Sequence, residues 1–440
     1  MREASFHPPL TLSGRYVELV PLTVERAPEL LWAWRDPEAV RLLRVQYGNT
    51  VEEVESTVRQ VLEVQAQGDA LAFATVLRAS GRAIGMTRFG NIDRRSNAVE
   101  IGGTILDSTF WRTPVNTEAK LLMLRHAFEV EGAHRVQLQT DARNLRSQRA
   151  IERLGTTPEA RLREDVLLPD GTFRTSVYYS LLEAEWPDAR ARLEAALERP
   201  WEPPPPTAGP KVLARGAPSA PQTDEGTARF TRSPELRGRW VHLEPLTRAR
   251  LPELDAAGND PEIWTYMRIR HGDTPAGMSA LVDELLGDRD RGLVLPYVIR
   301  ADDPERVVGG IRYLDIRRRD RGVEIGTWLS RAVWRTPVNT EAKYLMLRHA
   351  FEVEGAHRVQ LKTDVRNGRS QQAILRLGAV PEGPMRDHYR FDWGGYRTSL
   401  FYSILESEWP RVKAHLETQL ARPFPGPLRP LPAAGPPPEA

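Results

Sequence analysis

The stretch Trp111–Ala119 combines residue types that could bind an anion. It reads WRTPVNTEA, follows the apolar run VEIGGTIL, and opens a segment with helical periodicity. Backbone amides at the start of a helix, with the helix dipole behind them, form a ready site for a phosphate. The amides here would be those of Val115, Asn116 and Thr117, and Arg112 beside them could add charge-assisted hydrogen bonds. The pattern fits an anion site, although an ordinary helix start can look the same.

This stretch belongs to a block that occurs twice. Trp111–Gly155 returns as Trp334–Gly378, and the copies differ only at first-copy positions 121, 139, 142, 145, 149 and 152. The period is far longer than that of a solenoid repeat, so it indicates two whole domains. The second copy offers an equivalent set of anion-binding groups: Arg335, Val338, Asn339 and Thr340.

Strands and helices surround each copy of the block. Alternating and apolar runs predict strands in the first half at Arg15–Leu22, Ala70–Leu77, Ala83–Phe89, Ala98–Ile105, Arg135–Thr140, Arg161–Leu168 and Arg174–Leu181. Helices are expected at Val24–Arg35, Val51–Gln67, Glu118–Val130 and Leu145–Leu154. In the second half, the corresponding strands are predicted at Arg239–Leu246, Leu293–Arg300, Val307–Asp315 and Gly322–Leu329. The corresponding helices are predicted at Arg248–Ala257 and Ala276–Gly287. This order predicts an α/β (α+β) class.

Composition shifts give the expected domain boundaries. Residues 1–198 form the predicted N-terminal domain and residues 230–421 the C-terminal domain. Residues 199–229 are rich in proline, alanine and glycine and are predicted to be a linker, because they cannot bury enough apolar area to fold. Residues 422–440 have the same composition and are predicted to be a disordered tail.

Composition also excludes several kinds of function. A formal net charge of +2 over 440 residues argues against nucleic-acid binding driven by bulk charge. The chain has no cysteine, which rules out disulfides and thiolate ligands, and its histidines lack metal-ligand spacing, so we expect no metal site. No run of about eighteen apolar residues occurs, so we expect no membrane association and a cytoplasmic location.

The ordered series of motifs resembles the GCN5-related N-acetyltransferase (GNAT) superfamily. The series is EIG on a strand, a tryptophan before TEA at a helix start, and N-x-x-S on a last helix that ends in RLG. The segments Tyr179–Trp186 (YSLLEAEW) and Tyr402–Trp409 (YSILESEW) are similar to the branch that includes the ribosomal-protein N-terminal acetyltransferases RimJ and RimL. The resemblance covers Arg15–Leu197 and Arg239–Leu420. It implies two acyl-CoA N-acyltransferase domains in tandem, each with a mixed, splayed sheet flanked by helices.

The resemblance implies transfer of an acetyl or other acyl group from acyl-CoA to a primary amine by direct attack. The helix-opening loops Arg112–Thr117 and Arg335–Thr340 would hold the CoA pyrophosphate. Contacts to the pantetheine arm are implied for Asn144, Ser147, Asn367 and Ser370. Glu100 and Glu324 match the position of the carboxylate that takes the proton of the amine. The departing thiolate would be protonated by Ser147 and Ser370, or by Tyr179 and Tyr402.

Alternatives stay open at this point. The family usually carries glycines where this chain has Pro114 and Asn116, so the cofactor site could have been lost. The chain could then be a non-catalytic CoA- or protein-binding module, or have one active and one degenerate unit. The two glutamates could face solvent or pair with arginines, and the two tyrosines could belong to the core. The sequence is compatible with a small-molecule amine or a peptide amine as the acceptor.

It is also compatible with three kinds of assembly: an internal pseudo-dimer, a monomer or a homodimer. The divergent ranges 24–67 and 248–287 predict different acceptor pockets.

Overall fold

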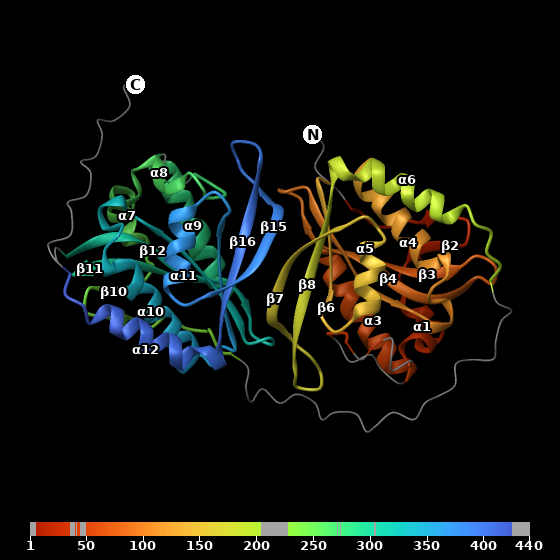
Figure 1. Cartoon of the computed structure of the whole chain (residues 1–440), viewed down its shortest axis with the longest axis horizontal. Helices are drawn as coiled ribbons and strands as arrows, with labels where there is room; N and C mark the ends of the chain where they lie inside the picture. The colour runs from red at the N-terminus through yellow and green to blue at the C-terminus, as the bar shows by residue number, and fades with distance from the viewer. Residues whose placement is uncertain are drawn as a thin grey trace. The chain divides into compact units, whose positions relative to one another are not determined.

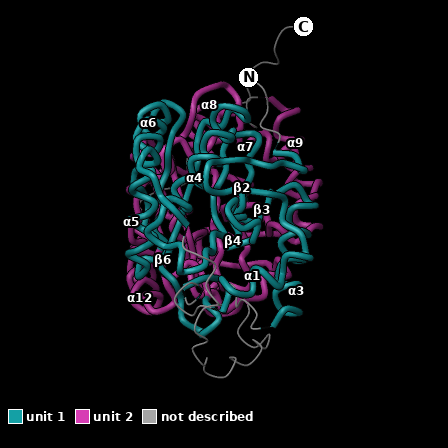
Figure 2. Tube along the Cα trace, turned by 90° about the vertical axis from the view of Figure 1, so that its right-hand side faces the viewer, with its two compact units in different colours: residues 1–162, 168–221 teal, residues 163–167, 222–440 magenta. Residues whose placement is uncertain are grey.

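The computed structural model describes residues 6–35, 40, 42–44, 50–203, 228–270, 272, 274–302 and 305–424. The chain divides into two compact units, residues 1–162 with 168–221 and residues 163–167 with 222–440 (Figure 2). Residues 204–227 of the expected linker and the tail from residue 425 lie outside the described residues. The domain boundaries stated above stay predictions.

The first unit is an eight-stranded mixed sheet in the order β1-β2-β3-β4-β5-β6-β8-β7 (Figure 1). The strands are β1 (Leu12–Ser13), β2 (Val17–Pro21), β3 (Ala70–Leu77), β4 (Arg82–Asp93), β5 (Ala98–Leu106), β6 (Arg135–Asp141), β7 (Thr157–Leu167) and β8 (Phe173–Leu182). β5 and β6 run parallel, whereas the pairs from β1 to β5 and the β6–β8 pair are antiparallel. β3 is buried along its whole length, which explains its continuous apolar sequence.

Helices cover both faces of this sheet. They are α1 (Ala27–Trp34), α3 (Val51–Ala66), α4 (Pro114–Arg125), α5 (Leu145–Glu152) and α6 (Trp186–Leu197). α4 and α6 pack with β5, β6 and β8 in one apolar cluster, and α1 and α3 pack with the other face of β3 and β4 in a second cluster. α3 begins where expected because Thr50 and Glu53 form a reciprocal capping box. α6 was not predicted from the sequence.

The second unit repeats this architecture. Its sheet has the order β15-β16-β14-β13-β12-β11-β10-β9. The strands are β9 (Leu236–Arg237), β10 (Val241–Pro245), β11 (Leu295–Asp302), β12 (Glu305–Arg317), β13 (Gly322–Leu329), β14 (Arg358–Asp364), β15 (Val380–Arg390) and β16 (Tyr396–Leu405). The helices are α7 (Leu251–Gly258), α8 (Pro261–Trp264), α9 (Pro275–Asp290), α10 (Pro337–Glu352), α11 (Gly368–Arg376) and α12 (Trp409–Leu420). The predicted fold class, two mixed sheets flanked by helices, is confirmed.

A buried glutamate fixes α4 to the start of β2. The Glu118 carboxylate accepts hydrogen bonds from the backbone amides of Arg15 (2.6 Å), Tyr16 (2.7 Å) and Val17 (2.8 Å). A Cβ atom on Gly14 would lie 2.5 Å from Cδ of Glu118, so only glycine lets the chain approach this closely. Glu341 makes the same three contacts in the second unit. The glutamate of the TEA motif therefore positions the helix.

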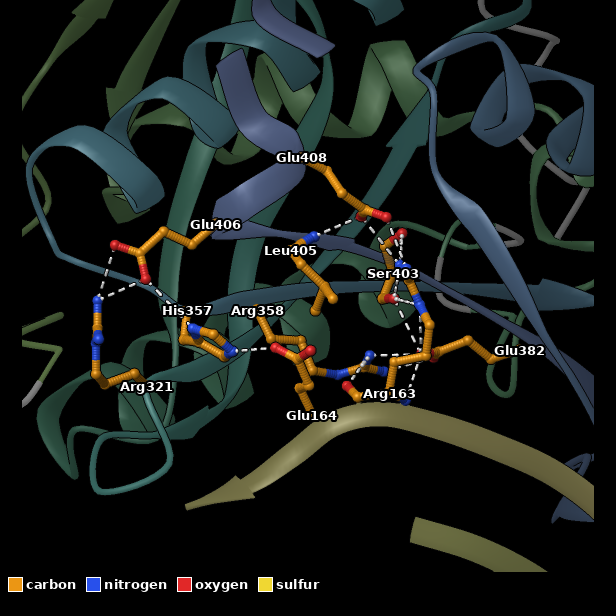
Figure 3. A network of polar contacts seen from close by, with 10 residues as sticks. All are labelled: Arg163, Glu164, Arg321, His357, Arg358, Glu382, Ser403, Leu405, Glu406 and Glu408. Atoms are coloured by element: carbon orange, nitrogen blue, oxygen red, sulfur yellow. Dashed lines mark hydrogen bonds and ion pairs between the residues drawn. The ribbon is translucent and has the colours of Figure 1, made fainter. Parts of the chain in front are cut away.

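Buried ion pairs hold the outer strands of each sheet. Arg135 donates to both oxygens of Glu159 (2.9 and 2.6 Å), and both side chains are almost fully buried. In the second unit Arg358 binds Glu382 in the same way at 2.6 Å for each contact. Residues 163–167, the end of β7, belong to this second unit, and the Arg163 guanidinium donates there to Glu408 (2.7 Å) (Figure 3).

The same network extends along the second unit to a histidine. Figure 3 shows His357 between two carboxylates: Nε2 lies 2.7 Å from Glu164 and Nδ1 lies 3.2 Å from Glu406. Arg321 also donates to Glu406 (3.0 Å). All of these groups are satisfied by one another, so we interpret the network as structural.

Candidate active site

In each sheet, the two parallel strands move apart directly after the glutamate that was predicted to act as the base. β5 and β6 pair only through Ala98–Arg135, Val99–Val136 and Glu100–Gln137. Among the described residues, the rest of β5, Ile101–Leu106, has no strand partner on that side. β13 and β14 pair over the matching three residues and part after Glu324. An opening between two parallel strands leaves backbone donors and acceptors available to an extended ligand.

Glu100 lies at the start of this opening, surrounded by amide side chains. Its Oε2 accepts hydrogen bonds from Asn91 Nδ2 (3.0 Å), Gln137 Nε2 (3.1 Å) and Gln139 Nε2 (3.0 Å). All three donors are neutral, and Glu100 makes no ion pair within the described part of the chain. The predicted alternative of an arginine partner is therefore wrong for Glu100; Arg174 acts one hydrogen bond further away, where it donates to Gln139 Oε1 (3.1 Å).

A pocket of about 450 Å³ opens at Glu100. Its charged lining residues are Asp69, Arg88, Asp93 and Glu100, and α3 contributes Val64. Three carboxylates against one guanidinium make the pocket acidic, which favours a cationic ligand.

Glu324 stands in the same place in the second unit but has a cation beside it. The Lys362 ammonium lies 2.9 Å from Glu324 Oε2, and Gln360 Nε2 donates to the same oxygen at 2.9 Å. Burial acts to raise the pKa of Glu324, but the charge of Lys362 outweighs it and the pKa lies below its ordinary value. Lys362 also donates to the Tyr389 hydroxyl (2.9 Å). Glu324 is therefore a poorer base than a carboxylate without a cation beside it.

The predicted anion-binding loop does open a helix. Thr113 is the N-cap of α4, and its hydroxyl accepts from the Val115 amide at 3.4 Å. That amide is thus already engaged, and those of Asn116 and Thr117 follow it in the first turn. Arg112 is exposed beside them with a φ of 62°, a left-handed conformation that non-glycine residues rarely adopt. In the second unit Arg335 has a φ of 66° and Thr336 caps α10 through the Val338 amide at 3.3 Å, with Asn339 and Thr340 next.

A tryptophan connects this loop with α5. The Trp111 indole donates to the carbonyl of Leu106 (3.1 Å), and the Arg146 guanidinium stacks 3.4 Å from the centre of its ring. Arg369 lies 3.3 Å from the Trp334 ring in the second unit. Each unit thereby holds an arginine of the last helix of the block beside the predicted phosphate loop.

The predicted pantetheine contacts lie at the start of α5. Asn144 is its N-cap, and Asn144 Oδ1 accepts from the Ser147 amide (3.0 Å). Asn367 and Ser370 repeat this cap on α11 at 3.0 Å. Ser147 and Ser370 are half-buried, and among the described residues no hydrogen bond of either hydroxyl is found. The two asparagines are therefore occupied by capping, while the serine hydroxyls are open to a ligand.

The structure does not bring the tyrosines together with the glutamates. Tyr179 pairs with Leu138 across β6 and β8, and both point into the cluster of α4 and α6, whereas Glu100 faces the α3 side. The Tyr179 hydroxyl donates to Glu152 (3.4 Å), and burial and that carboxylate raise the pKa of Tyr179 to about 12. Tyr402 is likewise in the core, and burial raises its pKa. Both tyrosines are poorly suited to donate a proton to a thiolate.

Residues that the sequence analysis overlooked surround the site. The amides of Asn91, Gln137 and Gln139 carry no motif, although position 139 is one of the six exchanged between the copies. Lys120 is only 5% exposed, and its Nζ donates to the hydroxyls of Thr87 (2.9 Å) and Thr104 (2.6 Å). Lys343 is equally buried in α10 and donates to Thr327.

Two histidines of the block, His126 and His349, are buried in the core. Over the described residues, no group of three His, Cys, Asp or Glu side chains could hold a metal ion. Within the same residues, no helix has the length and apolarity needed to cross a bilayer.

Comparisons with known proteins find one family in both units. The family described as "Acetyltransferase (GNAT) domain" matches residues 17–157 and again residues 241–380. The chain is 23% identical over 176 residues to the uncharacterized N-acetyltransferase p20 of Bacillus licheniformis, covering 40% of this chain and 98% of p20. It is 33% identical over 105 residues to YdaF of Bacillus subtilis (strain 168), a proposed ribosomal N-acetyltransferase, covering 24% of this chain and 57% of YdaF. The solved structure of a proposed acetyltransferase from T. thermophilus is 39% identical over 43% of this chain and 98% of its own length, with a TM-score of 0.40.

Proposed function

Since this chain belongs to the acetyltransferase (GNAT) family, we propose that it transfers an acetyl or other acyl group from acyl-CoA to a primary amine by direct attack. The observation that carries this proposal is the separation of β5 and β6 directly after Glu100. It leaves an extended opening with a carboxylate on one side and a capped helix start at its end.

The donor fits the groups around α4. An extended pantetheine arm can hydrogen-bond to the free edge of β5, and the pyrophosphate suits the amides of Asn116 and Thr117. Arg112 and Arg146 supply positive charge next to that turn. Pro114 occupies the first helical position, where its missing donor costs least. These residues support acyl-CoA as the co-substrate, and the second unit carries an equivalent set.

The reaction needs a neutral amine and a proton for the leaving group. Glu100, directly or through a water, takes a proton from the acceptor ammonium, and the amine nitrogen then bonds to the thioester carbonyl carbon. The bonded nitrogen then gives up a second proton, the carbon–sulfur bond breaks, and the thiolate leaves with that proton as free CoA. The hydroxyl of Ser147 is the group on α5 that can orient the sulfur or pass that proton. The products are an amide and a thiol.

Thiol release tests the proposal directly. The chain contains no cysteine, so a thiol reagent detects only the CoA that is set free. Purified full-length protein with acetyl-CoA should release thiol only when an amine acceptor is added, and the acylated amine should appear by mass spectrometry. Absence of both products across peptides, diamines and amino acids would contradict the proposal and favour a binding module.

A further inference from the structure

We infer that Glu100 of the first unit provides a binding place for a cationic amine. In the second unit, the Lys362 ammonium occupies the equivalent place beside Glu324. The first unit alone would then bind a cationic amine acceptor. This inference rests on the proposed function for the meaning of "acceptor", but the charge arrangement it describes can be measured without turnover.

The surroundings of the two carboxylates differ by one exchange within the repeated block. Position 139 of β6 corresponds to position 362 of β14, one of the six differences in the repeated block. Gln139 donates to Glu100 at 3.0 Å, whereas Lys362 contacts Glu324 at 2.9 Å. The second unit thus shows an ammonium group bound to the very carboxylate that has only neutral donors in the first unit.

Strand register identifies further exchanges around the two carboxylates. Gly90 pairs with Glu100 and Asp93 with Ala98, just as Leu314 pairs with Glu324 and Arg317 with Gly322. Asp93 and Arg317 therefore hold the same position. The left-handed residues Asn91 (φ 47°) and Asp315 (φ 48°) confirm the match, and this exchange gives the second unit one additional carboxylate.

The opposite wall of the pocket changes as well. Gly68 and Gly292, with φ values of 84° and 72°, occupy the same turn before β3 and β11. The residue that follows is Asp69 in the first unit and Leu293 in the second. From the first unit to the second, the site loses the carboxylate of Asp69, replaces that of Asp93 with the Arg317 guanidinium and gains the Lys362 ammonium, while Asp315 in place of Asn91 adds one carboxylate. The net change is towards positive charge, which disfavours a cationic ligand in the second unit.

Charge therefore assigns the acceptor class to the first unit. The lining of its pocket includes the carboxylates of Asp69, Asp93 and Glu100 and the guanidinium of Arg88. A primary amine that carries a second positive charge can leave one charge on the aspartates while the other nitrogen loses its proton to Glu100. In the second unit Lys362 is also bound to Tyr389 and lies 5.0 Å from the centre of its ring, so an external cation must compete with a tethered one.

Reciprocal exchanges test the inference on the full chain. Gln139→Lys copies the second unit into the first, Lys362→Gln does the reverse, and the double variant carries both. Arg149→Gln is the matched control, because it makes another of the six exchanges at an exposed site on α5. Calorimetric titration with 1,4-diaminobutane at low salt should give one site in the wild type and in the control. It should give none in Gln139→Lys, two in Lys362→Gln, and one in the double variant.

Thiol release measured in parallel separates the two hypotheses. Gln139→Lys should lower kcat/KM for the diamine by about 100-fold, while the Arg149→Gln control keeps the wild-type value. Two diamine sites or none in the wild type, or a site that survives Gln139→Lys, would overturn the inference. A single site that Gln139→Lys removes, in a protein that never releases thiol, would leave the inference standing and reject acyl transfer.

Discussion

Arg146 stacks on Trp111 with its guanidinium carbon 3.4 Å from the centre of the indole ring. This contact joins α5 to the loop that opens α4. In the sequence, β6 lies between that loop and α5. The Trp111 indole is fixed in turn by the carbonyl of Leu106 at the end of β5. One tryptophan therefore positions the predicted phosphate loop, the edge of β5 and the helix that carries Ser147.

Removing that stack should weaken donor binding in the first unit. We expect Arg146→Gln to raise the Kd of acetyl-CoA at one of the sites about fivefold, because an arginine–tryptophan stack contributes about 1 kcal/mol. Calorimetric titration with acetyl-CoA should then show two classes of site in the variant, where the wild type shows one. Arg149→Gln on the same helix should leave the titration unchanged, and equal weakening by both variants would assign the effect to bulk charge.

Replacing the free carboxylate should slow the chemical step. We expect Glu100→Gln to lower kcat/KM for the amine by about 10²- to 10⁴-fold, since general-base assistance typically contributes that much. The glutamine is isosteric and neutral, so loss of structure does not explain the change. The defect should shrink at high pH, where more of the acceptor is unprotonated. A pH–rate profile parallel to that of the wild type would rule out the role of Glu100 as a base.

The buried lysines should make stability depend on pH. Burial lowers the pKa of Lys120 from 10.5 to about 7, and that of Lys343 to about 7 as well. Between pH 7 and 10.5 the unfolded chain binds a proton on each lysine that the folded chain lacks, so the free energy of unfolding rises with pH in this window. Below pH 7 both states are protonated and the full burial penalty remains.

Lys120→Met isolates this effect. Its stability relative to the wild type should be greatest near pH 7 and should fall steadily towards pH 10, as measured by urea unfolding. The threonine hydroxyls that lose Lys120 lie 2.9 Å apart and can still bond to each other. Parallel curves for the two proteins across this range would show that Lys120 keeps an ordinary pKa.

The buried ion pair at the edge of the first sheet should be costly to break on one side. We expect Arg135→Met to reduce stability by about 3–5 kcal/mol, because it leaves the buried Glu159 carboxylate without its cation. Arg135→Met with Glu159→Leu should recover much of that loss. A double variant as unstable as the single one would mean that the two side chains matter through packing, and thermal unfolding distinguishes these outcomes.

The sequence by itself determined the features that depend on neighbours along the chain. The repeat gave two domains, β3 and β13 have the predicted bounds, and α4 begins at the predicted turn because a threonine cap followed by proline is a local signal. The resemblance, which rests on local motifs, placed Glu100 and Glu324. The terminal helices α6 and α12 were overlooked although each begins with Trp-Pro, a pair that suits a helix start.

Only the tertiary structure decided which groups meet. Glu100 and Gln139 are brought together because β5 and β6 run parallel with α4 between them in the chain, and no periodicity relates the two positions. The same crossover sets Lys362 on Glu324 and so makes two nearly identical blocks differ in charge at their sites. Burial of Lys120 between two threonines likewise depends on how α4 packs on β4 and β5. Long-range pairing and desolvation, which a linear pattern does not encode, account for these differences.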